Sequence, residues 1–540
     1  MSIFKLHDAV IDDFSRYVQS FFSIKDNRIN SLVEQELFLN RQLWPDVLIQ
    51  LNPSYLYAET VEDMVKLGKL NKLCAEVFRT KQNQSIKLFQ HQKEAIEKAL
   101  GKKHFIITSG TGSGKTLTYL IPIFNRIAQL QSQQVKAIII YPMNALVNSQ
   151  YQALREYAEA YKDRTRRECP VRFEKYTGQE TIDKKLEIQK NPPHILLTNY
   201  VMAELMLDRP AEHNFVDRAT SGLEFLVIDE LHTYRGRQGA DVGLLIRRLR
   251  EKCGNPGLLC IGTSATMAGG KKDSKKDRQE AIAKFGEKLF GVPFGADNIV
   301  EETLDRSTDH RIQPTPEVLK DSINADLPLM SADFLVNPLS VWIEETFGTE
   351  IEADGTLRRK TPISLKQGAK KLSEITGVSE ELCMKRLQEF LLAAIKLSAN
   401  QEMPLFAFKL HQFFSQGQTI YATFELPEVR KLSVEGEYYA SDGYSASLFY
   451  PLQFCRTCGQ EYYAVYKSEQ DKVFKPYYPS METSPLDDLV SGYLMIVPEA
   501  QAIPWIFDSL PPEWFNQDGR LKPDYRDYYP QLYWVRPDGS

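Results

Sequence analysis

Short apolar runs alternate with longer amphipathic stretches between about residues 81 and 266. The runs are HFIIT (104–108), KAIIIY (136–141), ILLT (195–198), FLVID (225–229) and LLCIGT (258–263). Continuous apolar strands separated by segments of helical length are typical of a parallel sheet that is covered by helices on both faces. The pattern therefore predicts an α/β domain over residues 81–305.

The flanking regions have different patterns. Residues 1–80 show apolar residues at helical spacing and no glycine before Gly68, which predicts an N-terminal helical extension. The polar stretch GGKKDSKKDRQE, from Gly269, favours an exposed loop or a domain edge. After residue 306 the periodicity weakens and aromatic residues become frequent, so residues 306–540 are expected to form a C-terminal α+β accessory module.

Composition limits the classes of protein that fit. The 540 residues are 43% hydrophobic and 25% charged, as in an ordinary globular protein, and the formal net charge is −5. Any contact with nucleic acid must then be a local surface. Seven cysteines are too few for a disulfide framework and fit a reducing cytosol. No run of about 18 apolar residues occurs, and aspartates interrupt the N-terminal stretch, so we expect a cytoplasmic protein with no membrane segment.

The strongest chemical signal is IITSGTGSGKT, residues 106–116, between an apolar strand and an amphipathic segment. Gly110, Gly112 and Gly114 let the backbone turn tightly, so that its N–H groups face an anion at a helix N-terminus. Lys115 would reach the β- and γ-phosphates of ATP, and the Thr116 hydroxyl would hold Mg²⁺. Ser109, Thr111 and Ser113 complete the predicted phosphate-binding loop, although the strict motif has glycine at position 109. The alternative is a glycine-rich turn with an incidental lysine.

A metal-holding carboxylate is expected at the end of a neighbouring strand, and FLVIDELH provides one. Asp229 would hold Mg²⁺ through water, and Glu230 would orient and deprotonate the attacking water. The alternative is an acidic cap on the next helix. His232 could relay the state of the nucleotide or simply pack, while Ser264 and Thr266 in IGTSATM could couple the DELH segment to a neighbouring domain.

The order TSGTGSGKT, DELH and TSAT resembles motifs I, II and III of superfamily 2 helicases. YPMNALVNSQ (141–150), YTGQE (176–180) and LLTNYVM (196–202) are similar to motifs Ia, Ib and Ic, and DELHTYRGRQGADVGLLIRRLR resembles the Lhr/YprA-like branch. Large helicases of antiphage defence have similar sequences in this segment. The resemblance implies a RecA-like P-loop NTPase fold, with Gln92 in LFQHQKEAI reading the adenine edge. It also implies ATP hydrolysis that drives movement along DNA, 3′ to 5′.

The loops that resemble motifs Ia, Ib and Ic make physical sense as strand-binding segments. Each presents small polar residues after an apolar strand: Asn144, then Thr177 and Gly178, then Thr198 and Asn199. Backbone N–H groups and short side chains can hold phosphates without a basic patch, which is compatible with the net charge. The alternative for any one loop is ordinary helix capping.

The resemblance also implies a second RecA-like domain that supplies arginine fingers. No Q-x-x-G-R-x-x-R signature follows residue 305. Arg235 and Arg237 in YRGRQG lie between DELH and TSAT, so they belong to the first domain. They could contact nucleic acid or an adjoining domain, or form a solvated basic loop. The second domain is therefore expected either in the missing part of a longer chain, which the turn-like ending LYWVRPDGS favours, or in a partner subunit.

The C-terminal region contains FCRTCGQEYY, with Cys455 and Cys458 followed by a glycine. Two thiolates at this spacing are a half-site for Zn²⁺, but no second C-x-x-C exists to complete it. A knuckle without metal and a redox pair are the alternatives. Upstream, MPLFAFKLHQFF is expected to be a strand, with Lys409 and His411 as weaker candidates for nucleic-acid contact.

Three hypotheses for function remain. The first is the ATP-binding half of a helicase or translocase that acts on single-stranded or duplex DNA. The alternative is an ATP-dependent switch or assembly subunit that needs a partner RecA-like domain and does not unwind by itself. A third is a zinc-bearing adaptor with a vestigial ATPase, which the intact lysine and acidic pair disfavour.

Overall fold

The computed structural model describes residues 2–21, 23–110, 112–130, 134–265, 274–398, 405–415, 419–436, 439, 447–468, 473–477, 489–497 and 510–540. The chain divides into two compact units, each described below by itself. Unit 1 comprises residues 1–52, 311–348 and 361–540, and unit 2 comprises residues 53–310 and 349–360. This division differs from the expected segments 1–80, 81–305 and 306–540, because the N-terminal 52 residues fold with the C-terminal region.

A parallel sheet forms the centre of unit 2. Among the described residues it has seven strands, in the order β11-β5-β10-β9-β6-β8-β7. The strands are β5 (Phe105–Thr108), β6 (Ala137–Tyr141), β7 (Phe173–Lys175), β8 (Ile195–Asn199), β9 (Phe225–Ile228), β10 (Leu259–Ser264) and β11 (Ile299–Glu301). The apolar runs predicted as strands all lie in it, and β5, β6 and β9 are buried along their whole length.

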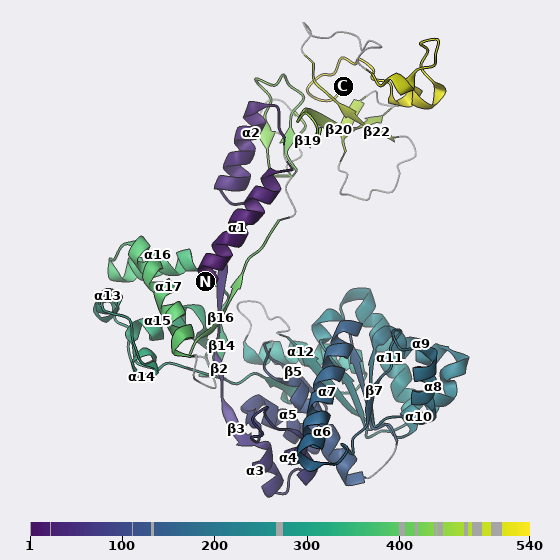
Figure 1. Ribbon diagram of the computed structural model, residues 1–540, viewed down its shortest axis with the longest axis vertical. Coiled ribbons are helices and arrows are strands. Elements are labelled where there is room, and N and C mark those ends of the chain that lie inside the picture. The colour runs from purple at the N-terminus through teal and green to yellow at the C-terminus, as the bar shows by residue number, and fades with distance from the viewer. Residues whose placement is uncertain are drawn as a thin grey trace. The chain divides into compact units, whose positions relative to one another are not determined.

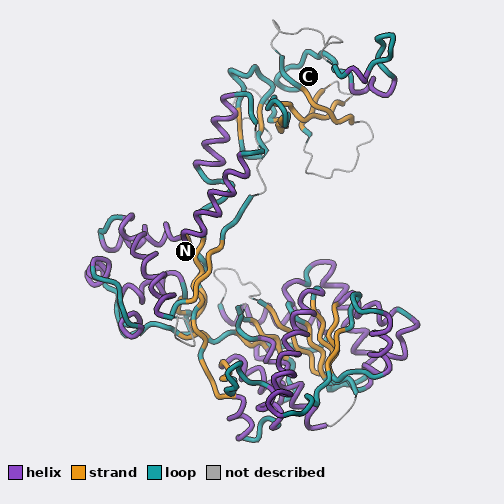
Figure 2. Tube along the Cα trace, viewed as in Figure 1, coloured by secondary structure: helices purple, strands orange, loops and turns teal. Residues whose placement is uncertain are grey.

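Helices cover both faces of this sheet (Figures 1 and 2). The helices of one face are α3 (Val61–Lys66), α4 (Lys72–Val77), α5 (Gln90–Leu100), α6 (Lys115–Leu130) and α7 (Asn144–Thr165). Those of the other face are α8 (Ile182–Lys190), α9 (Tyr200–Asp208), α10 (His213–Ser221), α11 (Gly236–Cys253) and α12 (Lys275–Phe290). Each face has its own hydrophobic core. The predicted α/β, RecA-like fold is therefore confirmed.

One local expectation about this unit is wrong, and a second is covered only in part by the described residues. Residues 53–80 are not purely helical, since they include β2 (Ser54–Tyr55) and β3 (Tyr57–Thr60), and β3 pairs with β4 (Lys87–Phe89). The polar stretch from Gly269 was expected to be an exposed loop or a domain edge; residues 269–273 lie outside the described residues, and α12 begins at Lys275. Ser274 caps that helix by accepting the Asp277 N–H, and the Asp277 carboxylate accepts the Ser274 N–H, so local capping starts a helix in a highly charged sequence.

A β-hairpin from beyond the α/β segment completes unit 2. Its strands are β13 (Thr349–Ile351) and β14 (Leu357–Arg359), paired antiparallel. Arg278 on α12 holds the hairpin through Glu352, with 2.8 Å between Nη1 and Oε1. The stretches of chain before and after the hairpin both belong to unit 1.

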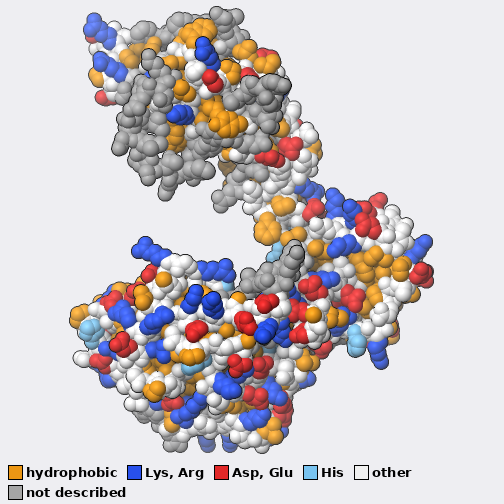
Figure 3. Space-filling view, turned by 180° about the vertical axis from the view of Figure 1, so that it is seen from behind, with side chains coloured by type: hydrophobic (Ala, Val, Ile, Leu, Met, Phe, Trp, Pro, Cys, Tyr) orange, Lys and Arg blue, Asp and Glu red, His pale blue; other side chains and the backbone are white. Residues whose placement is uncertain are grey.

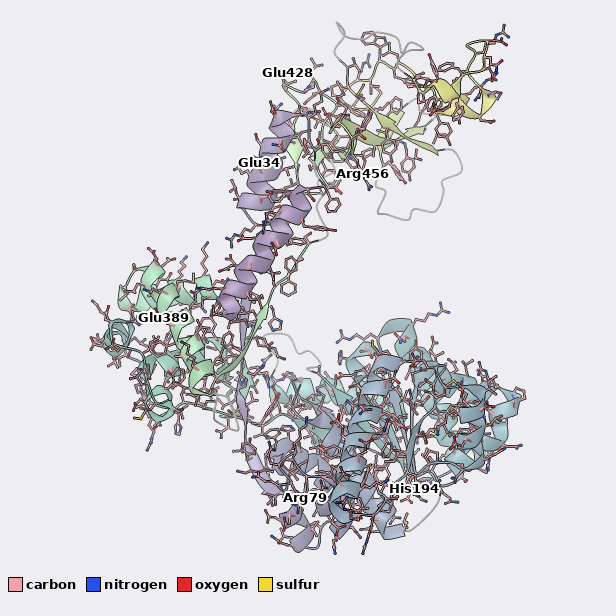
Figure 4. The ribbon with its side chains drawn as sticks, in the orientation of Figure 1. Glu34, Arg79, His194, Glu389, Glu428 and Arg456 are labelled. Carbon is pink, nitrogen blue, oxygen red and sulfur yellow. The ribbon has the colours of Figure 1, made fainter. Side chains whose placement is uncertain are left out.

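Part of unit 1 is a helical core closed by a small antiparallel sheet. The helices are α13 (Pro316–Asn324), α14 (Ser331–Leu335), α15 (Pro338–Phe347), α16 (Leu365–Thr376) and α17 (Glu380–Leu397). The sheet has the order β15-β1-β16, with β15 (Ile363–Ser364), β1 (Leu48–Asn52) and β16 (Ala407–His411). The strand expected in FKLHQFF is thus confirmed as β16. Glu389, labelled in Figure 4, lies on α17 and pairs with Arg386 at 2.9 Å.

The remainder of unit 1 is rich in β-structure. Its strands are β17 (Tyr421–Ala422), β18 (Leu432–Ser433), β19 (Tyr450–Phe454), β20 (Glu461–Ser468), β21 (Val473–Pro476) and β22 (Leu489–Leu494). They pack with α1 (Ile3–Gln19), α2 (Asn27–Val33) and the π-helix Glu34–Leu39. The fully buried Arg430 contacts Asp26 at 2.5 Å and Glu461 at 2.9 Å. An ion cluster therefore ties the N-terminal helices to this β-sheet.

None of the described helices is long and apolar enough to cross a membrane.

Candidate functional site

The phosphate-binding loop, residues 109–116, connects the carboxyl end of β5 to the first turn of α6. Gly112 and Gly114 have φ of +85° and +69°, a backbone region that glycine adopts readily and other residues rarely do. The Ser109 and Ser113 hydroxyls are buried and lie 2.6 Å apart. The side chain of Ser109, at the position where the strict motif has glycine, therefore makes a contact across the loop. Thr111 lies outside the described residues.

Gln92 on α5 holds this loop from the side. Its amide nitrogen donates to the carbonyl oxygens of Ser113 at 3.1 Å and Gly114 at 3.0 Å, and its amide oxygen accepts the Phe89 N–H at 2.9 Å. A side chain at position 114 would collide with this amide. The structure thus shows Gln92 as a brace for the loop, and its reading of adenine stays a prediction.

Lys115 and Thr116 begin α6 beneath the loop. The Lys115 ammonium donates to the carbonyl oxygens of Ser109 at 2.9 Å and Gly110 at 3.3 Å. Burial lowers the pKa of Lys115 from its ordinary value, although the nearby carboxylates of Glu230 and Asp229 oppose this. The Thr116 hydroxyl donates to the side chain of Gln150 on α7 at 3.3 Å.

The acidic pair follows β9, whose neighbour β10 runs beside the strand that carries the phosphate-binding loop. Asp229 is buried and accepts a hydrogen bond from the Thr263 hydroxyl. Burial raises the pKa of Asp229 to about 6, while that hydrogen bond acts in the opposite direction. Glu230 has φ +53°, a conformation that costs energy in a residue with a side chain, and its N–H donates to the same hydroxyl at 3.2 Å.

Two of the residues expected to couple the nucleotide site to a neighbouring domain, His232 and Ser264, are in contact. His232 Nδ1 lies 3.2 Å from the Ser264 hydroxyl and 3.2 Å from a carboxylate oxygen of Glu230. The ring therefore bridges the DELH segment and the end of β10, as a relay would require. Thr266 lies outside the described residues.

Arg359, on the hairpin, also touches the phosphate-binding loop. Its guanidinium pairs with Glu302, and Glu302 in turn accepts the Gly110 N–H at 2.9 Å. Sequence reasoning missed this pair, because Arg359 comes from a strand far along the chain and no local motif marks it. Its contact with the loop is visible only in three dimensions.

The predicted strand-binding loops line up along one edge of the sheet. They follow β6, β7 and β8, which are neighbours in the sheet, so all three lie at its carboxyl edge. The Asn199 amide donates to Asn144 at 2.5 Å. Thr177 and Thr198 are buried, and their hydroxyls donate to Glu180 at 2.7 Å and to the Tyr176 carbonyl at 2.7 Å.

These contacts divide the predicted nucleic-acid residues into two groups. The hydroxyls of the two threonines are used inside the protein, whereas Gly178 is exposed and Asn144 and Asn199 are partly exposed. Arg235 and Arg237, at the start of α11, are exposed as well. On the face of unit 2 seen in Figure 3, Lys and Arg side chains are interspersed with Asp and Glu.

The cysteine pair lies in a turn between β19 and β20. Cys455 is partly exposed and Cys458 is exposed, and Arg456, labelled in Figure 4, lies between them. Gly459 has φ +74°, and its carbonyl accepts the Lys25 N–H at 2.9 Å. Within the described residues no three His, Cys, Asp or Glu side chains are grouped to hold a metal ion. The backbone of this turn contacts the N-terminal segment at Lys25. Binding of Zn²⁺ stays a prediction.

Comparison with known proteins finds relatives for part of this chain. Residues 89–273 match the family described as DEAD/DEAH box helicase. The chain is 26% identical to the Druantia protein DruE of Escherichia coli (strain UMEA 4076-1), over 51% of this chain and 21% of that protein. It is 30% identical to the uncharacterized ATP-dependent helicase YprA of Bacillus subtilis (strain 168), over 38% of this chain and 25% of YprA.

A third relative is also described as an ATP-dependent helicase. The ATP-dependent helicase Lhr-Core of Methanothermobacter thermautotrophicus is 29% identical over 38% of this chain and 23% of that protein. The aligned part of the chain spans only about a fifth to a quarter of the length of these relatives. The resemblance inferred from the motifs is confirmed: residues 89–273 match the DEAD/DEAH box helicase family, and the relatives of this chain include YprA and Lhr-Core.

Proposed function

We propose that this chain is the ATP-binding half of a DNA helicase or translocase and that it hydrolyses ATP. The observation that carries the proposal is the convergence of the phosphate-binding loop and the acidic pair. They lie at the carboxyl ends of β5 and β9, which flank β10, and Lys115 is close enough to both carboxylates for them to affect its pKa. Carboxyl ends of parallel strands are where open α/β sheets bind their ligands.

The residues of the site fit ATP with Mg²⁺. The glycines at positions 112 and 114 keep side chains out of the loop, so its N–H groups and the Lys115 ammonium can hold the phosphates. Thr116 and Asp229 would hold Mg²⁺, which supplies charge neutralisation for the transferred phosphoryl group. Glu230 would accept a proton from the attacking water.

DNA as the second ligand rests on the loops after β6, β7 and β8. These loops adjoin the ATP site along the same edge of the sheet, so a change at the nucleotide could be passed to them through the strands. The relatives YprA and Lhr-Core are described as ATP-dependent helicases. Asn144, Gly178, Asn199 and the backbone N–H groups of the three loops are the proposed contacts to the DNA backbone.

A second RecA-like domain is part of the proposal, as further chain or as a separate subunit. It would supply the arginine that stabilises charge in the transition state, since no signature for that arginine follows residue 305. The second candidate function, an ATP-dependent switch that needs such a partner and does not unwind, is favoured by this same missing signature.

The test measures binding of Mg²⁺–ATP and the rate of hydrolysis, with and without single-stranded DNA. We expect binding by the wild-type chain, slow turnover, loss of binding in Lys115→Ala, and loss of turnover with retained binding in Glu230→Gln. Lys162→Ala, at an exposed position of α7, is the matched control. Unchanged affinity in Lys115→Ala would refute the site. Fast hydrolysis stimulated by DNA would refute the need for a second domain.

A further inference from the structure

Arg359 is anchored at the phosphate-binding loop by a compact set of contacts within unit 2. Its Nε donates to one carboxylate oxygen of Glu302 at 2.5 Å, and its Nη2 donates to the other at 3.1 Å. Nη2 also donates to the Tyr55 hydroxyl at 2.8 Å. The side chains of Arg359 and Glu302 are only 13% and 12% exposed, so this bidentate ion pair is well shielded from water.

The pair is joined to the phosphate-binding loop at Gly110. The Gly110 N–H donates to Glu302 at 2.9 Å, and a Cβ at position 110 would lie 3.0 Å from Arg359 Nη2. The guanidinium therefore packs directly against the backbone of the loop. Glycine at this position leaves the room that the guanidinium occupies.

A carboxylate beside a phosphate-binding loop creates an electrostatic conflict. Glu302 holds the Gly110 N–H, but a lone negative charge at this place would repel a polyphosphate that binds the same loop. The Arg359 guanidinium cancels that charge while leaving the hydrogen bond to Gly110 intact. Burial acts to lower the pKa of Arg359, but the bonds to Glu302 outweigh it and raise that pKa, so the arginine stays charged.

We propose that Arg359 is a positioning residue of the nucleotide site, which neutralises Glu302 so that Glu302 can hold the phosphate-binding loop without repelling the phosphates of ATP. This inference rests on the proposed function, because it assumes that the loop binds ATP. It extends the site beyond residues 89–273, the part of the chain that matches the helicase family. The chain enters unit 1 directly before and directly after residues 349–360, the segment of unit 2 that carries the arginine.

The test is a double-mutant cycle that follows binding of mant-ATP, a fluorescent ATP, with Mg²⁺. Arg359→Ala should weaken binding about tenfold, which corresponds to about 1.4 kcal/mol. Adding Glu302→Gln should restore affinity to within about twofold of Glu302→Gln alone, because glutamine keeps an oxygen for the Gly110 N–H but removes the charge. Arg359→Lys should retain most of the affinity, since it keeps the charge. Arg358→Ala, on the same strand, is the matched control and should bind like wild type.

The outcomes separate this inference from the proposed function. Failure of the wild-type chain to bind mant-ATP, or unchanged binding in Lys115→Ala, overturns both. Normal wild-type binding with an unaffected Arg359→Ala overturns the positioning role alone. A defect in Arg359→Ala that Glu302→Gln does not rescue shows a purely structural role and also overturns it. Should Arg359→Ala fold poorly by circular dichroism, Arg359→Gln takes its place in the cycle, with the same expected rescue.

Discussion

Replacing Asp229 with Asn should make unit 2 more stable while it abolishes turnover of Mg²⁺–ATP. Asp229 is 9% exposed, and burial raises the pKa of its carboxyl from 3.8 to about 6. Each pKa unit corresponds to about 1.4 kcal/mol, so holding this carboxylate ionised at pH 7 costs about 3 kcal/mol. Asparagine removes the charge and keeps an oxygen that can accept the hydrogen bond from the Thr263 hydroxyl.

The dependence on pH follows from the direction of this change. A raised pKa means that the folded protein binds the proton more tightly than the unfolded chain, so stability falls as pH rises from about 4 through 6 and is level above. The advantage of Asp229→Asn should therefore be greatest at pH 7 and about half as large near pH 5.

Calorimetry in EDTA at several pH values measures this difference. At pH 7 we expect the melting temperature of unit 2 to rise by roughly 5 to 10 °C in Asp229→Asn. Mg²⁺–ATP should then stabilise the wild-type protein more than the variant, because the variant lacks the carboxylate that would hold the metal. An equal or lower melting temperature of Asp229→Asn at pH 7, or an advantage that does not shrink toward pH 5, would refute the reasoning.

Two further predictions concern unit 1. Arg430→Ala leaves two shielded carboxylates without their cation, so we expect the free energy of unfolding, measured with urea, to fall by about 3–5 kcal/mol. Arg456→Ala, at an exposed position, is the control and should change it little. Equal stability of the two variants would contradict this. Gly459→Ala puts a side chain at φ +74° with its Cβ 2.6 Å from the Ser23 carbonyl, so it should cost about 1–3 kcal/mol. Gly436→Ala, where the nearest atom is 3.7 Å away, is the control, and similar losses at both positions would count against a role of backbone strain.

Local sequence was sufficient for the parts of the fold that local patterns determine. The buried strands of the parallel sheet are uninterrupted apolar runs, and the glycines and Lys115 mark the phosphate-binding loop by their spacing. The order of DELH and TSAT along the chain also implied that the two strands that lead into them end side by side, as β9 and β10 do. Each strand and each motif is recorded within a dozen residues, although DELH (229–232) and TSAT (263–266) are separated along the chain.

Features that depend on distant pairing were not predictable in this way. Strand β1 belongs to unit 1 because Leu48 pairs with His411, and nothing near residue 48 specifies that partner. The burial of Thr177 and Thr198 is set by neighbouring strands, although their residue type suggested contact with nucleic acid. The pairing of Arg359 with Glu302 likewise joins two segments 57 residues apart.

The alternation of the chain between its two units has a consequence for synthesis on the ribosome. Residues 1–52 of unit 1 precede unit 2 along the chain, but β1 cannot pair with β16 until residues 407–411 have left the exit tunnel. The parallel sheet of unit 2 is fully synthesised with β11, at residue 301, more than a hundred residues earlier. Unit 2 can therefore assemble its sheet first, while the N-terminal segment waits for its strand partner. Truncation at residue 310 would leave residues 1–52 with their apolar side chains exposed, and it would also remove the hairpin that completes unit 2.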